Sequence, residues 1–92
     1  MPYAIQIKAS ALKALEKLPQ ALRVRIRDRI AALAANPRPP GAVKLSAADD
    51  FWRIRAGDWR VVYAVLDRRL IVLVVRIGHR RDVYRRPPGK RG

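Results

Sequence analysis

The stretch FWRIRAGDWRVVY, residues 51–63, decides the fold of this chain. Two runs rich in aromatic and β-branched residues flank Gly57-Asp58, and such a pair between two strands is typical of a two-residue hairpin turn. If this pair forms the turn, Arg55 stands directly opposite Arg60 on the neighbouring strand. The stretch therefore predicts an antiparallel hairpin with a defined register.

Alternation along the hairpin separates its side chains onto two faces. Trp52 and Ile54 point one way and Arg53 and Arg55 the other, because successive side chains of a strand alternate. With the register above, Arg60 joins the two arginines. The face of Ile54 also receives Val61, Tyr63 and Val65. We therefore expect one face for the core and one face that carries three arginines.

These three arginines have no evident role in folding. Like charges directly opposite each other across two strands destabilise a sheet by about 0.2–1 kcal/mol. No acidic residue of the hairpin lies where it would neutralise them. A solvated sheet face often carries an isolated cation, so one arginine would mean little. Three convergent arginines favour a binding site for an anion.

Outward from the hairpin, the N-terminal half predicts one strand and two helices. Residues 3–7 alternate as a strand does. Ser10 suits the N-cap of a first helix, which Pro19 ends because the residue before a proline avoids helical backbone. A second helix should run from Pro19 to about Ala35, with arginines on both sides of an apolar stripe. The stripe is Leu22, Ile26, Ile30 and Leu33, and the arginines are Arg23, Arg25, Arg27 and Arg29.

The C-terminal half predicts three strands, residues 51–56, 59–66 and 70–77, with Gly78 ending the last. Their short connections imply an antiparallel meander. The expected fold class is α+β: an N-terminal strand, a two-helix hairpin and a three-stranded antiparallel meander, with the helices packed on one face of the sheet. We expect residues 1–86 to form a single domain and residues 87–92 a disordered basic tail.

Composition points to a polyanionic partner. The 92 residues include 21 Lys and Arg against seven Asp and Glu, a formal net charge of +14. Such a charge fits nucleic acid or an acidic protein. Sixteen of the cations are Arg, which holds phosphate as a planar fork, although a GC-rich genome produces the same bias.

Other features exclude several classes of protein. There are no cysteines, which excludes disulfides and thiolate metal sites. The longest apolar run, residues 70–75, is much shorter than a membrane span, and the first residues lack a secretory pattern. We therefore expect a cytoplasmic protein with no membrane partner.

Three longer stretches carry a family resemblance. The segments YAIQI with ALKALEKLP and RIRDRIAAL, then KLSAADDFWRIRAGDWRVVYAVLD, then VRIGHRRDVYRR resemble the RelE/ParE superfamily of bacterial toxins. The chain looks most like the RelE-type messenger-RNA interferases. The resemblance covers about residues 3–86, and its most discriminating pieces are RIRAGDWRVVY and GHRRDVY.

The resemblance implies roles for particular residues. In RelE-like toxins, residues matching Arg53 and Arg55 hold the scissile phosphate, and one matching Arg60 stabilises the transition state. A residue matching Arg80 stabilises charge or the leaving group, and one matching Tyr84 is the base that activates the ribose 2′-OH. We expect further RNA contacts from Lys44, Arg76, His79 and Arg81, although a lone histidine is more often a surface or packing residue. The face of Arg76 depends on the length of the turn at residues 67–69.

The resemblance also implies partners and a mechanism. RelE-like toxins cut messenger RNA in the ribosomal A site, and an antitoxin, usually acidic and RelB-like, wraps the toxin. Attack by the RNA's own 2′-OH needs charge stabilisation and proton transfer but no metal or other cofactor. We therefore expect a ribosome-dependent endoribonuclease of a type II toxin–antitoxin system, with little activity on naked RNA.

Two alternatives stay open. A ParE-type toxin shares the fold but poisons DNA gyrase, and it generally lacks the full basic set with the terminal tyrosine. A non-catalytic RNA- or ribosome-binding protein would also suit a basic chain with exposed aromatics. A Tyr84→Phe variant separates enzyme from binder, because only an enzyme should lose cleavage while keeping its affinity for the ribosome.

Overall fold

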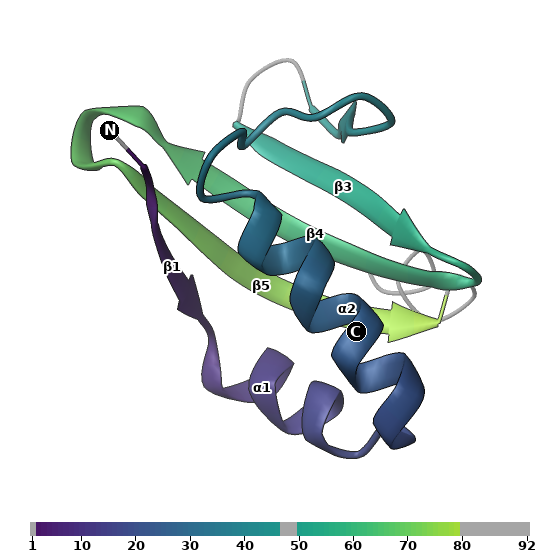
Figure 1. The fold of residues 1–92 in the computed structure, drawn as a ribbon. Helices are drawn as coiled ribbons and strands as arrows, with labels where there is room; N and C mark the ends of the chain where they lie inside the picture. The colour runs from purple at the N-terminus through teal and green to yellow at the C-terminus, as the bar shows by residue number, and fades with distance from the viewer. Residues whose placement is uncertain (1, 47–49, 80–92) are drawn as a thin grey trace.

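A computed structural model describes residues 2–46 and 50–79 of the chain. Within this part, five strands form one mixed sheet in the order β1-β5-β4-β3-β2, and two helices cover one of its faces (Figure 1). The elements are β1 (Ala4–Ile7), α1 (Ala9–Glu16), α2 (Gln20–Ala32), β2 (Val43–Lys44), β3 (Phe51–Ala56), β4 (Trp59–Leu66), a 3-10 turn η1 (Asp67–Arg69) and β5 (Ile71–His79). The predicted α+β class, the order of its elements and the packing of both helices on one face are confirmed.

The central hairpin forms with the predicted register. β3 and β4 pair antiparallel, and Arg55 stands opposite Arg60. Gly57 has φ +63°, whereas Asp58 has a negative φ, as a type II′ hairpin turn requires. Glycine adopts this backbone without the steric cost that a side chain would add.

The sheet is wider than the meander. β1 pairs parallel with β5, so the N-terminal strand returns to the edge beside the last strand. At the other edge β2 pairs antiparallel with β3. The sequence did not predict β2, because a strand of two residues is too short to show alternation.

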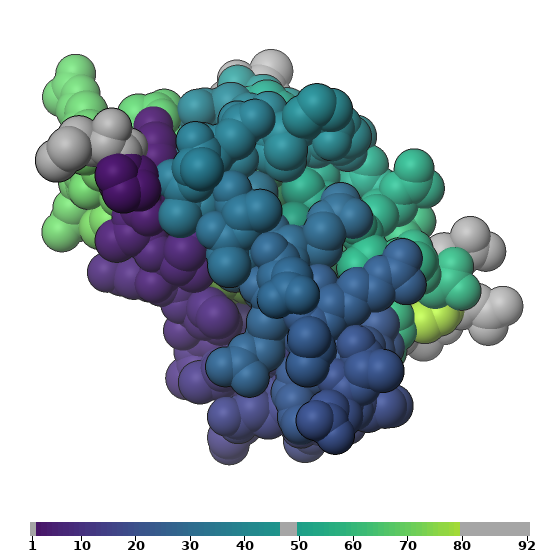
Figure 2. Space-filling model, in the orientation of Figure 1, coloured from purple at the N-terminus to yellow at the C-terminus, as the bar shows by residue number. Residues whose placement is uncertain are grey.

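The core lies between the helices and the sheet. Ile26 and Ile30 of α2 and Leu33 directly after it are buried there, Leu22 is partly buried, and α1 adds the buried Leu15. The sheet contributes the buried residues Ile54, Val61, Tyr63, Val65, Val72, Val74 and Ile77. Burial of each large aliphatic side chain contributes about 1.5–3 kcal/mol, so the packing of both helices on the sheet contributes much of the stability. In Figure 2 the outer surfaces of α1 and α2 form much of the visible face.

Two details of the predicted elements are wrong. Ser10 does not cap α1, because the helix already begins at Ala9 and Lys8 occupies the N-cap position. The backbone N–H of Lys8 still donates to the carbonyl of Val74 at 2.8 Å, which holds the chain extended up to that residue. Gly78 does not end the last strand, which continues to His79 because Gly78 pairs with Arg60.

No helix within residues 2–46 and 50–79 is long and apolar enough to cross a membrane.

Candidate anion-binding site

Four arginines share the sheet face that points away from the helices. Arg55 pairs with Arg60, and Arg60 pairs with Gly78 on β5. In the next row Arg53 pairs with Val62, and Val62 pairs with Arg76. The Cβ atoms of directly opposed residues lie about 4.5–5.5 Å apart, so Arg55 and Arg60 are neighbours, whereas Arg53 and Arg76 lie on either side of Val62. We call Arg53, Arg55, Arg60 and Arg76 the arginine face.

A β-bulge brings Arg76 onto this face. Val74 pairs with Tyr63 and Arg76 pairs with Val62, so Val75 lies between them with no paired residue on β4. One extra residue reverses the alternation. Val74 therefore points into the core, Arg76 points away from it, and Ile77 returns to the core at 5% exposure. The bulge, and not the length of the turn before β5, decides the face of Arg76.

Two of the arginines are buried without full hydrogen bonding. Arg53 is 9% exposed and Arg60 is 7% exposed. The Nε atom of each is buried and has no hydrogen-bond partner. Arg60 donates from Nη1 to the carbonyl of Gly57 at a long 3.4 Å. An unsatisfied buried donor costs about 1–3 kcal/mol, so neither guanidinium is fully compensated by the fold.

The acidic residues of the described part form their ion pairs elsewhere. Within the part of the chain that the structure describes, both ion pairs involve Arg38, and none involves Arg53, Arg55 or Arg60. Guanidinium groups close together in a partly desolvated place bind phosphate oxygens strongly, because each N–H donates a charge-assisted hydrogen bond. The arginine face is therefore suited to hold a phosphodiester and to stabilise extra negative charge on it.

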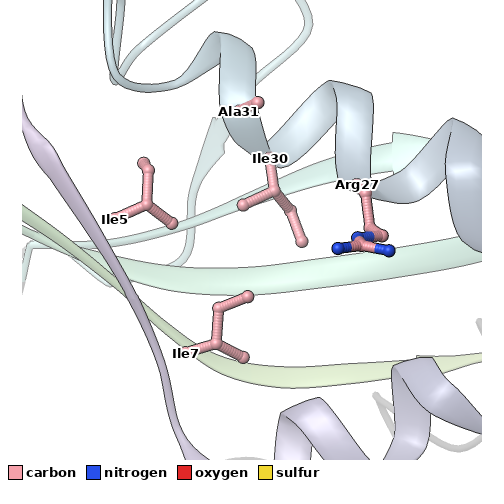
Figure 3. A pocket seen from close by; sticks show the side chains of 5 residues that line it. All are labelled: Ile5, Ile7, Arg27, Ile30 and Ala31. Carbon is pink, nitrogen blue, oxygen red and sulfur yellow. The ribbon is translucent and has the colours of Figure 1, made fainter.

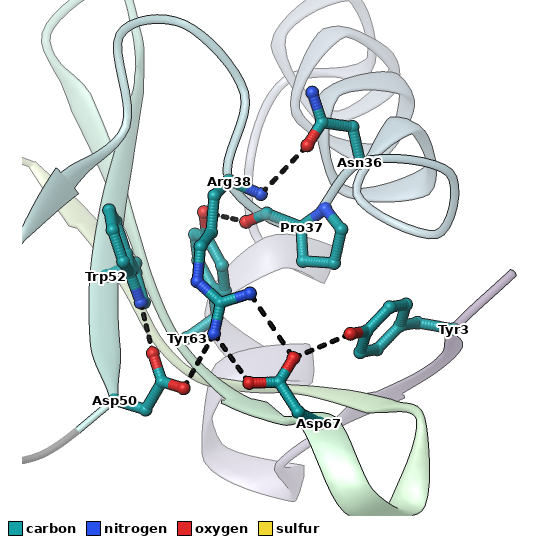
Figure 4. A network of polar contacts seen from close by, with 8 residues as sticks. All are labelled: Tyr3, Asn36, Pro37, Arg38, Asp50, Trp52, Tyr63 and Asp67. Atoms are coloured by element: carbon teal, nitrogen blue, oxygen red, sulfur yellow. Dashed lines mark hydrogen bonds and ion pairs between the residues drawn. The ribbon is translucent and has the colours of Figure 1, made fainter.

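Arg38 forms a separate cluster that the sequence did not predict (Figure 4). Its Nη2 atom lies 2.7 Å from Asp50 Oδ2 and 2.8 Å from Asp67 Oδ2. Tyr3 donates to Asp67 Oδ1 at 2.6 Å, and Trp52 donates from Nε1 to Asp50. The guanidinium carbon also lies 5.5 Å from the ring centroid of Trp52. The cluster ties together β1, the segment after α2, the start of β3 and the turn before β5.

The contacts of this cluster shift the pKa of its members. The hydrogen bond from Arg38 lowers the pKa of Asp67 to about 2, and the hydrogen bond from Tyr3 acts in the same direction. The hydrogen bond that Tyr3 donates to Asp67 raises the pKa of Tyr3. Burial raises the pKa of Tyr63 to about 12, and the hydroxyl of Tyr63 donates to the carbonyl of Pro37 at 2.6 Å. These groups hold fixed protonation states near neutral pH and act as structural contacts.

Some predicted contact residues lie apart from the arginine face. Lys44 pairs with Trp52, so it lies on the helix side of the sheet at the β2 edge. His79 pairs with Trp59, and its ring meets the Trp59 ring edge-on with centroids 5.8 Å apart. The structure therefore does not bring either residue together with the four arginines. Arg80, Arg81, Tyr84 and the tail at 87–92 lie outside the described residues.

A cavity of about 180 Å³ lies between β1 and α2 (Figure 3). Ile5, Ile7, Ile30, Ala31 and Arg27 line it. Apart from the stem and head of Arg27 its walls are apolar, and it lies on the helix side of the sheet. It is therefore unsuited to the chemistry of the arginine face. Nor do His, Asp and Glu side chains among residues 2–46 and 50–79 form a group of three that could hold a metal ion.

Comparisons with known proteins agree with the geometry. Residues 5–84 match the family described as ParE toxin of type II toxin–antitoxin system, parDE. A RelE-like toxin protein of Escherichia coli is 36% identical over 91% of this chain and 92% of its own length. The mRNA interferase toxin RelE of Escherichia coli K12 is 31% identical over 91% of this chain and 92% of its own. The crystal structure of the intact Escherichia coli RelBE toxin–antitoxin complex contains a chain that superposes with a TM-score of 0.74 at 26% identity, covering 84% of this chain and 95% of that one.

Proposed function

Because this chain belongs to the RelE/ParE superfamily of type II toxin–antitoxin toxins and is of the RelE type, we propose that it is an endoribonuclease that cuts messenger RNA in the ribosomal A site. The relative from Escherichia coli K12 carries the name mRNA interferase. One observation supports the proposal above all. Arg53 and Arg60 are held buried on one face, each with an Nε donor that nothing in the fold satisfies.

The arginines have different roles at the scissile phosphate. Arg53 and Arg55 hold its non-bridging oxygens. Arg60 stabilises the additional negative charge of the pentacovalent transition state. Arg76 adds positive potential from the neighbouring strand. Fixed donors of this kind need no reorganisation during the reaction, so their contribution exceeds that of mobile surface cations.

The reaction uses the ribose of the message as nucleophile. The 2′-oxygen forms a bond to phosphorus, the bond from phosphorus to the 5′-oxygen of the next nucleotide breaks, and a 2′,3′-cyclic phosphate and a 5′-hydroxyl result. The 2′-hydroxyl loses a proton and the 5′-oxygen gains one. We assign removal of the first proton to Tyr84 and charge stabilisation at the leaving oxygen to Arg80. Both assignments concern residues outside the described part.

An acidic antitoxin is the proposed regulator. The net charge of +14 favours fast, oriented association with an acidic protein. A structure similar to this chain is part of a RelBE toxin–antitoxin complex. Purified toxin should bind the product of an adjacent acidic reading frame, and that binding should abolish cleavage.

Cleavage on defined ribosomes tests the activity. Purified protein should cut a message within the A-site codon of programmed ribosomes and should leave the same message without ribosomes nearly intact. Tyr84→Phe should abolish cutting while ribosome affinity persists. Equal cutting of both substrates would refute the dependence on the ribosome.

A gyrase poison is the second candidate, because the matching family description names ParE toxins. The same preparation separates the two activities. If it leaves programmed ribosomes intact and traps cleaved DNA on gyrase, the endoribonuclease proposal is wrong.

A further inference from the structure

Helix α2 carries four arginines that divide into two pairs. With about 100° between successive residues, Arg25 and Arg29 lie on one side of the buried Ile26–Ile30 stripe, and Arg23 and Arg27 lie on the other. The contacts agree with this division. Arg23 donates from Nη1 to the carbonyl of Glu16 in α1, and Arg27 lines the cavity beside β1. We call Arg25 and Arg29 the hairpin-side pair.

Arg25 extends to the turn of the central hairpin. Its Nη1 atom lies 3.9 Å from the position that a Cβ atom would take on Gly57. From the opposite side of the sheet, Arg60 donates to the carbonyl of the same glycine. The turn therefore has a guanidinium on each side, one from the arginine face and one from α2. Positive charge continues around the end of the hairpin.

This charge is not neutralised by the fold. Arg25 and Arg29 are exposed and, among the residues that the structure describes, take part in no ion pair. Asp58 lies at the same turn, but no ion pair joins it to Arg25. Nothing in the core requires arginine at either position, since both side chains lie outside the apolar stripe.

The opposite flank has a different environment. Arg27 projects from α2 beside Ile5 and Ile7, over the apolar cavity (Figure 3). Its alkyl stem covers apolar surface there, which is a packing role for a long cationic side chain. The two flanks therefore carry equal charge and differ in their distance from the arginine face.

We propose that the hairpin-side pair is a second contact for RNA phosphates. This inference rests on the proposed function: an RNA strand that leaves the arginine face at the hairpin turn meets Arg25 next and then Arg29, one helical turn away. The phosphates belong either to the message or to ribosomal RNA, and both present the same chemistry. An acidic protein on this flank is the competing occupant.

The test compares variants of equal charge on the two flanks. The probe is a programmed ribosome whose A-site codon contains 2′-deoxynucleotides, so that binding is measured without cutting. The Arg25→Gln/Arg29→Gln variant should bind several-fold more weakly at physiological salt, and the slope of log affinity against log salt should fall by about 1.4, or 0.7 for each phosphate contact. The Arg23→Gln/Arg27→Gln variant, which removes the same charge from the other flank, should weaken binding less and should lower the slope by less than about 1.4.

Each outcome decides the proposal. If Arg25→Gln/Arg29→Gln lowers the affinity only for ribosomes that carry a message, the phosphates belong to the message. If it also lowers the affinity for ribosomes without a message, they belong to ribosomal RNA. Equal weakening by Arg25→Gln/Arg29→Gln and Arg23→Gln/Arg27→Gln, or unchanged RNA affinity with weakened antitoxin binding, would overturn the proposal. If wild-type protein neither binds nor cuts, the proposed function fails. If it binds and cuts while Arg25→Gln/Arg29→Gln binds equally well, only the present inference fails.

Discussion

Arg38 and the arginine face show two uses of the same side chain within one small sheet. Arg38 is about a third exposed, yet two carboxylates neutralise it and an aromatic ring lies beside it. Arg53 and Arg60 are almost completely buried, yet each keeps an Nε atom without a partner. The carboxylates therefore stand beside the more exposed arginine and not beside the buried ones. Solvation favours the reverse, because a buried cation needs a counter-charge more than an exposed one does.

The difference identifies which arginines serve the fold. Asp50 and Asp67 both stand beside Arg38, where they join segments that are distant in sequence. No carboxylate of the described residues forms an ion pair with Arg53, Arg55 or Arg60. A substitution of Arg38 should therefore lower stability, whereas a substitution on the arginine face should lower RNA binding and cleavage.

Among single substitutions on the arginine face, Arg60→Met should have the largest effect on activity. Removal of one donor that stabilises transition-state charge typically lowers the rate by about 10²–10³-fold. Stability should stay equal or rise by up to about 1 kcal/mol, because the like-charge contact with Arg55 is relieved. Cleavage of programmed ribosomes and urea unfolding measure the two quantities. A large loss of stability would mean that Arg60 serves the fold.

Arg38→Met should show the opposite pattern. It leaves Asp50 and Asp67 without their cation, and the expected loss is about 1 kcal/mol, since the ion pairs are partly exposed to solvent. Cleavage per folded molecule should not change. A specific loss of cleavage with normal stability would place Arg38 in the site and remove the contrast.

The smallest expected effect is a dependence on pH below 4. The folded-state pKa of Asp67, about 2, lies below the ordinary value near 3.9. Its contribution is therefore complete above about pH 4 and disappears as the pH falls toward 2. The urea midpoint of wild type should approach that of Asp67→Asn over this interval. Asp58→Asn, which removes a carboxylate without an ion pair, is the matched control.

The hairpin and its arginines could be predicted because the information is local. Two turn residues set the register, and alternation then places Arg53, Arg55 and Arg60 on one face. Arg76 could not be placed, because the bulge at Val75 lies within an unbroken apolar run where alternation carries no information. Arg38 could not be predicted either, since its carboxylates lie 12 and 29 residues away and meet it only after folding. Local patterns place Arg53, Arg55 and Arg60 on one face, whereas the ion pairs of Arg38 depend on tertiary structure.

The salt dependence of RNA binding tests the central distinction most directly. Affinity for a programmed ribosome with an uncleavable A-site codon is measured across a salt series for wild type, for Arg38→Met and for the triple variant Arg53→Met/Arg55→Met/Arg60→Met. We predict that the triple variant lowers the slope of log affinity against log salt by about 2, in keeping with three lost phosphate contacts, and that Arg38→Met leaves it unchanged. An unchanged slope in the triple variant, or an equal fall in Arg38→Met, would contradict the account.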